Sequence, residues 1–192
     1  MPDGDELLRL ALSRPAEAVA AADRLLAAGT DPAEASFARQ ARAIVLRDAG
    51  RFTEAVQESR RALRLADASG DRDRVVDVRA TLGAALVMGG RTAAGLAMLD
   101  AAVGASTGRL AGRVLMRRGY LLGTLGRRGD ALRDLNRAIV LLRRAGDPLW
   151  EARARMSRFD VYATAGHAAH ADRDLDIAER LFRQAGQDLE RP

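Results

Sequence analysis

Cysteine and lysine do not occur in this chain of 192 residues, and aromatic residues make up only 4 % of it. Without cysteine, no disulfide forms and no thiolate serves as a nucleophile or zinc ligand. The runs of valine, isoleucine, threonine and aromatic residues that are typical of β-strands are also missing. No apolar run approaches the ~18 residues that a membrane span needs, and the acidic start at 1–6 is unlike a signal peptide. We therefore expect an α-helical, cytoplasmic protein that makes no contact with a membrane.

Charge is abundant but unevenly distributed along the chain. Hydrophobic residues make up 48 % and charged residues 30 %, a composition typical of a folded protein. The net charge is +5, and residues 109–144 contain ten arginines against two aspartates, a balance of +8, which leaves −3 for the rest. Two interpretations of this stretch stay open: its arginines bind acidic groups of a partner, or they lie on a solvated helix face.

Four glycines divide the chain into repeating units. Gly50, Gly90, Gly126 and Gly166 are separated by 40, 36 and 40 residues, and each stands between two helical patterns. Glycine adopts the left-handed conformation that ends a helix and begins a tight turn. The spacing therefore predicts a series of helical hairpins, each with a glycine turn.

Signals for helix starts agree with this division. Asp31-Pro32 and Asp147-Pro148 combine an N-cap acid with a first-turn proline, and Asp71 is a further N-cap. We predict ten helices in five antiparallel hairpins, 5–28, 32–69, 72–105, 109–145 and 148–185. The individual helices are expected at 5–13, 15–28, 32–49, 52–69, 72–89, 92–105, 109–126, 129–145, 148–165 and 168–185.

Small residues recur where the two helices of each hairpin are expected to cross. On the first helix these are Ala43, Gly83 and Gly119, with Phe159 as an exception; on the second they are Ala55, Gly95, Ala131 and Ala171, followed by Ala62, Ala102, Ala138 and Ala178. The apolar residue between them is Leu99, Leu135 or Leu175, with Ser59 as an exception. This pattern resembles the tetratricopeptide (TPR) family over residues 31–186. The resemblance implies one repeat domain over 1–192, an all-α, right-handed α-solenoid.

One string supports a narrower resemblance. The residues from Arg143 to Arg153, Arg-Arg-Ala-Gly-Asp-Pro-Leu-Trp-Glu-Ala-Arg, are similar to the N-terminal TPR region of actinobacterial CHAT-domain (caspase-like) proteins. In that family a protease-like domain with a His/Cys pair follows the repeats. The resemblance implies a sensor or regulatory array, and it implies no catalytic activity for these residues. We expect no cofactor.

The TPR resemblance places a partner-binding groove on the first helix of each hairpin. The predicted groove residues are Phe37, Gln40, Arg47, Asp77, Met88, Arg109, Arg113, Met116, Arg117, Tyr120, Arg153, Met156 and Asp160. Because Arg109, Arg113 and Arg117 recur at a spacing of four, they form one helix stripe suited to carboxylate groups. We predict a protein or peptide partner that carries acidic groups.

Three other kinds of site are weighed against this hypothesis. Nucleic acid is the alternative partner of the arginine-rich stretch 109–144, but only Tyr120 is available there for stacking on bases. A clamp for a C-terminal carboxylate is disfavoured because lysine is absent and the only asparagine, Asn136, lies on a second helix. His167 and His170 have no third ligand at a spacing that completes a metal site, so we expect none.

The last predicted helix carries an apolar edge that no later helix covers. Its residues are Leu175, Ile177, Leu181 and Phe182, and the pattern at 187–192 predicts no further capping helix. Terminal repeats normally have a polar outer face. We therefore expect self-association, a following domain or a partner at this edge.

Overall fold

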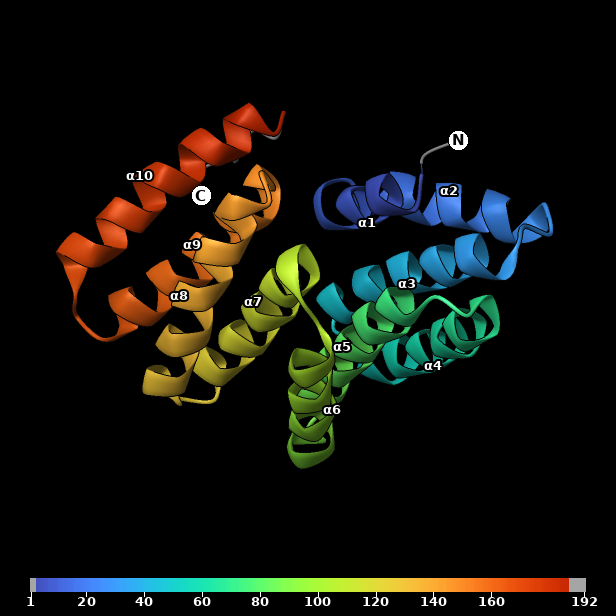
Figure 1. Ribbon diagram of the computed structural model, residues 1–192, viewed down its shortest axis with the longest axis horizontal. Coiled ribbons are helices and arrows are strands. Elements are labelled where there is room, and N and C mark those ends of the chain that lie inside the picture. The colour runs from blue at the N-terminus through green and yellow to red at the C-terminus, as the bar shows by residue number, and fades with distance from the viewer. Residues whose placement is uncertain (1–2, 187–192) are drawn as a thin grey trace. The chain divides into compact units, whose positions relative to one another are not determined.

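The computed structural model describes residues 3–186, and this part of the chain folds into ten α-helices without a β-strand. The helices are labelled in Figure 1. They are α1 (Gly4–Ser13), α2 (Pro15–Ala27), α3 (Pro32–Asp48), α4 (Phe52–Ser69), α5 (Arg72–Met88), α6 (Thr92–Ala105), α7 (Gly108–Thr124), α8 (Arg128–Arg144), α9 (Pro148–Thr164) and α10 (Ala168–Gln184). The all-α prediction is confirmed, and every helix begins and ends within two residues of its predicted bounds.

Side-chain caps explain why the predicted helix starts are correct. The Asp31 carboxylate accepts hydrogen bonds from the backbone N–H groups of Ala33 and Glu34, at 2.8 and 3.0 Å. Asp71 accepts from the N–H of Arg74 at 3.1 Å, at the start of α5. Each carboxylate satisfies donors that a helix leaves unpaired in its first turn, which fixes the residue at which the helix begins.

The turn glycines adopt the conformation that the spacing predicts. Gly50, Gly90, Gly126 and Gly166 have φ angles of 74°, 83°, 76° and 77°. A side chain at these positions is strained in the left-handed region, so glycine allows the tight turn that joins the two helices of a hairpin. Within α1–α6 and within α7–α10, consecutive helices then pack on each other as hairpins.

Contacts between Cα atoms divide the chain into two compact units, Met1–Ala105 and Ser106–Pro192. The first unit holds α1–α6; its apolar core includes Leu7, Leu8 and Ile44 from α1 and α3. The second unit holds α7–α10, with Leu149 and Phe182 in a cluster formed by α9 and α10. The division falls between the third and the fourth predicted hairpin, and the single repeat domain over 1–192 stays a prediction.

Small residues let the paired helices approach closely, as the sequence pattern predicts. In the hairpin of α5 and α6, a Cβ atom added at Gly95 lies only 2.5 Å from the carbonyl oxygen of Gly83. In the hairpin of α7 and α8, a Cβ atom at Gly119 lies 2.7 Å from Cγ of Leu135. Both separations are shorter than a van der Waals contact, so these crossings depend on the absence of a side chain.

Candidate functional site

The predicted groove residues of the first unit are only partly accessible. Phe37, Arg47 and Met88 are half-buried, while Gln40 and Asp77 have exposed fractions of 0 % and 5 %. The prediction that Gln40 and Asp77 line an open groove is therefore wrong. The side chains of these two residues lie between α3 and α5.

Gln40 and Asp77 belong to a buried polar network. The Gln40 Nε2 group donates hydrogen bonds to Asp77 Oδ2 at 2.9 Å and to the Thr81 hydroxyl at 2.7 Å. The Arg74 guanidinium donates to Gln40 and to Asp77, the latter at 3.2 Å, and lies 3.7 Å from the centre of the Phe37 ring. Because buried polar groups are stable only when hydrogen-bonded, this network fixes α3 against α5.

The arginine stripe of α7 is also mostly buried. Arg109 is exposed, but Arg113 and Arg117 have exposed fractions of only 5 % and 6 %. Arg113 Nη2 donates to Asp147 Oδ2 at 3.2 Å, and Arg109 Nε lies 3.8 Å from the same oxygen. The prediction of an open stripe is wrong for Arg113 and Arg117, whose charges are engaged inside the protein.

Trp150 is the centre of this arginine cluster. Its side chain is 2 % exposed, so it packs inside the protein. The guanidinium carbons of Arg113, Arg117 and Arg153 lie 5.0, 5.2 and 5.9 Å from the centre of a Trp150 ring. The electron-rich ring face attracts cations, so the tryptophan helps to hold several arginines in one place.

The remaining predicted groove residues of the second unit vary in exposure. Met116 is 6 % exposed and belongs to the core, which contradicts its prediction as a groove residue. Arg153 and Met156 are half-buried, whereas Tyr120 and Asp160 are exposed. Desolvation by neighbouring groups raises the pKa of the Asp160 carboxyl above its ordinary value.

An ion pair recurs at equivalent positions in three hairpins. Its arginine stands eight residues before the turn glycine and its acid eight residues after. The pairs are Arg42–Glu58, Arg118–Asp134 and Arg158–Asp174, with N–O separations of 3.6, 2.7 and 2.6 Å. In the hairpin of α5 and α6, Leu82 and Met98 occupy the two positions. The equal distances from the glycines were the sequence signal for these pairs, which the prediction overlooked.

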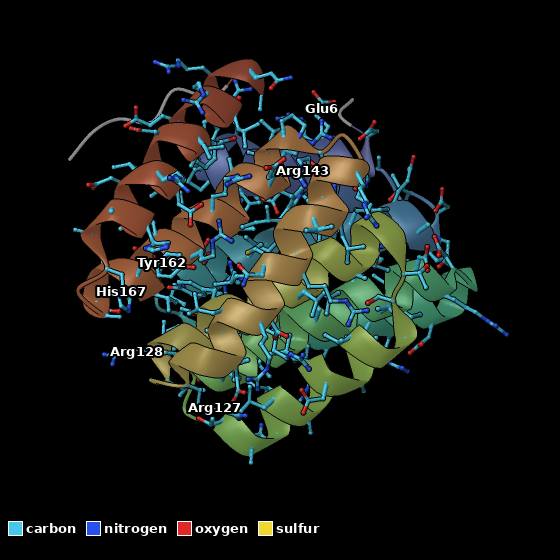
Figure 2. All side chains as sticks on the ribbon, turned by 60° about the vertical axis from the view of Figure 1, so that its left-hand side comes forward. Glu6, Arg127, Arg128, Arg143, Tyr162 and His167 are labelled. Carbon is cyan, nitrogen blue, oxygen red and sulfur yellow. The ribbon has the colours of Figure 1, made fainter. Side chains whose placement is uncertain are left out.

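The exposed arginines of the stretch 109–144 lie mainly on α8. Arg133, Arg137 and Arg144 are exposed on this helix, together with Val140, which is 37 % exposed. We call these four residues the α8 arginine face. Arg127 and Arg128 mark the start of the helix and Arg143 its other end (Figure 2).

Counted from Arg133 as position i, the residues of the face stand at i, i+4, i+7 and i+11, which lie on one side of a helix. This pattern is readable in the sequence, but the predicted groove included residues of first helices only.

The apolar edge at the end of the array is largely covered. Phe182 is 6 % exposed and packs with Leu149, and Leu181 is half-buried against the same cluster. Leu175 and Ile177 are half-buried. Residues 187–192, for which no capping helix was predicted, lie outside the described residues.

The two histidines gather around Tyr162 at the turn between α9 and α10. The ring centre of Tyr162 lies 6.2 Å from that of His167 and 5.1 Å from that of His170. Figure 2 shows Tyr162 and His167 next to each other. Within residues 3–186, no group of three or more histidine, aspartate or glutamate side chains is arranged to hold a metal ion. No helix in this part of the chain combines the length and apolar character needed to cross a membrane.

The hairpins define an all-α protein with a helical repeat-like fold. A crystal structure titled BtubC (BKLC) from P. vanneervenii is similar to this chain, with a TM-score of 0.62 and 17 % sequence identity. The match covers 98 % of this chain and 90 % of that chain. At this identity the similarity shows the fold alone. No protein-family model and no curated protein sequence matches the chain.

Proposed function

We propose that this chain is a non-catalytic TPR-like scaffold that binds a protein or peptide partner. The observation that carries the proposal is the close crossing of paired helices at small residues, as between Gly83 and Gly95. Arrays of such hairpins expose helix faces over a long surface, and proteins built from them commonly use that surface for binding. Residues 43–178 repeat the same small-residue positions four times with few departures.

The groove part of the proposal rests on the predicted residues that are accessible. Arg109, Tyr120 and Asp160 are exposed in the second unit, and Arg153 is half-buried. Arginine and tyrosine are frequent in protein interfaces because they combine hydrogen bonding with a large contact area. Buried Arg113 and Arg117 are framework residues in this proposal.

Selection of ligands from random libraries tests the proposal. The full chain is immobilised and exposed in parallel to a phage-displayed peptide library and to a random single-stranded oligonucleotide library. We expect convergent peptide sequences that bind the chain in solution when synthesised. Convergent oligonucleotides without convergent peptides would contradict the proposal.

Nucleic-acid binding is the second candidate, and the charge of the second unit favours it. Ser106–Pro192 contains 17 arginines against 11 acidic residues, a net charge of +6, whereas Met1–Ala105 has a net charge of −1. Phosphate binding releases counterions, so affinity for DNA falls steeply with salt. A gel shift that is strong at low salt and lost as salt rises would favour this candidate.

A role within a larger CHAT-type system is the finer part of the proposal. It rests on the string from Arg143 to Arg153. In this hypothesis the array senses or regulates a protease-like domain with a His/Cys pair. Sequencing the reading frame around the coding region checks it, because such a domain is expected in the same frame or in a neighbouring gene.

A further inference from the structure

The exposed positive charge of α8 is concentrated and locally unbalanced. After Asp134 the helix contains three arginines and no acidic residue up to its end at Arg144. Asp134 itself is 8 % exposed and is bound by Arg118 of α7 at 2.7 Å. Arg137 and Arg144 therefore carry positive charge that their own helix does not neutralise.

Among residues 3–186, only Asp130 competes for the arginines of the face. Asp130 accepts hydrogen bonds from Arg133 and from Arg127, the latter at 2.6 Å. The Arg133 side chain is nevertheless 75 % exposed. The side chains of Arg137 and Arg144 form no hydrogen bond or ion pair with any residue from 3 to 186. Their guanidinium groups are available to bind a carboxylate in a bidentate manner.

The spacing of the face restricts the partner. Arg133 and Arg144 are separated by about 16 Å along the helix axis, at ~1.5 Å per residue. Arg137 follows Arg133 by four residues, and Arg144 follows Arg137 by seven. Side chains at the same intervals on a second helix also lie on one side of that helix, so they can face these arginines. Exposed Val140 stands between the arginines and offers a small apolar contact to such a helix.

We propose that the α8 arginine face docks an acidic helical segment of a partner protein, an inference that rests on the proposed scaffold function. The carboxylates of this segment recur at i, i+4 and i+11, opposite Arg133, Arg137 and Arg144, with a small apolar residue at i+7 opposite Val140. A nucleic acid is the less suitable occupant because no aromatic residue occurs in α8 for stacking on bases.

Fluorescence anisotropy with a defined peptide tests the inference. The probe is a fluorescein-labelled peptide of roughly 16 alanine, glutamine and glutamate residues, with glutamates at the spacing of the face. An isomer of equal composition distributes the glutamates around the helix. The full chain is expected to bind the first peptide about tenfold more tightly than the isomer, with an affinity that falls as salt rises.

Matched variants distinguish peptide binding at the α8 arginine face from a general effect of the chain's net charge. The test variant is Arg133→Gln, Arg137→Gln and Arg144→Gln. The control carries Arg173→Gln, Arg180→Gln and Arg183→Gln, which remove the same charge from exposed positions of α10. The test variant is expected to weaken peptide binding about tenfold or more, and the control to change it by about twofold or less.

Several results would overturn the inference. An equal loss of peptide affinity in the test variant and the control would attribute binding to net charge. Equal affinities for the two peptides would show that the spacing of the glutamates does not matter. Peptide binding that persists in the test variant would place the site elsewhere while leaving the scaffold proposal intact. Tighter binding of a single-stranded oligonucleotide, lost in the test variant, would make the face a nucleic-acid surface. Self-association lost in the test variant, measured by sedimentation, would make a second copy of the chain the occupant.

Discussion

A methyl group added at Gly95 has no room between α5 and α6. The Cβ atom of alanine at this position lies 2.5 Å from the Gly83 carbonyl oxygen and 2.8 Å from the Val87 backbone nitrogen. Because these are backbone atoms, the two helices must separate and loosen their contact around Leu99, which is 0 % exposed. Overpacking of this kind costs about 1–3 kcal/mol, and the better helix propensity of alanine offsets about 1 kcal/mol of it.

We therefore expect Gly95→Ala to lower the free energy of unfolding by about 1 kcal/mol, equivalent to roughly 2–4 °C in the melting temperature of a chain of this size. Gly104→Ala is the matched control on the same helix, since a Cβ atom there meets nothing within 4 Å. It is expected to stabilise the protein by about 0.5 kcal/mol. Urea and thermal unfolding followed by circular dichroism measure both variants. Equal stabilisation by the two substitutions would refute the close crossing of α5 and α6.

Three further predictions concern polar groups. Gln40→Ala leaves Asp77 with fewer hydrogen bonds inside the protein, and we expect a loss of about 2 kcal/mol in urea unfolding; an effect below about 0.5 kcal/mol would contradict the buried network. Asp134→Met alone is expected to lower the free energy of unfolding by about 3 kcal/mol, because it leaves the charge of Arg118 unpaired. Combining it with Arg118→Leu is expected to restore most of this loss, because an apolar pair is less costly than an unpaired charge. Equal losses in the single and the double variant would show that the ion pair is not the cause. Because the pKa of Asp160 is raised in the folded protein, this residue contributes to the stability of the fold in full below the ordinary aspartate pKa of about 4. The contribution is lost as pH rises through the raised pKa. Asp160→Asn should therefore gain stability relative to the natural chain between acidic and neutral pH, and parallel pH profiles of the two proteins would disprove this assignment.

The helix bounds were predictable because their signals are local. A carboxylate such as that of Asp31 caps donors two and three residues ahead, and a glycine such as Gly126 needs only its own backbone angles to form a turn. Neither interaction depends on distant parts of the chain. The positions of close crossing were also predictable, since only small residues permit them.

The candidate site was less predictable because exposure depends on how each helix is rotated against its neighbours. Arg109 and Arg113 are four residues apart on α7, yet Arg109 is exposed and Arg113 is 5 % exposed beside Asp147 and Trp150. The acid caps the start of α9 and the tryptophan lies in its first turn, more than thirty residues further along the chain. Sequence spacing places residues on one helix stripe but does not say which neighbour covers it.

The sequence by itself determined an all-α array of hairpins, together with the bounds of each helix to within two residues, since caps, turns and periodicity act over a few residues. Only the tertiary structure decided which charges serve the framework and which remain available. Arg117 and Arg137 have the same side chain, but Arg117 packs near Trp150 while Arg137 faces solvent on α8. Contacts between helices distant in sequence made that difference, because burial is a property of the packed array and not of one helix.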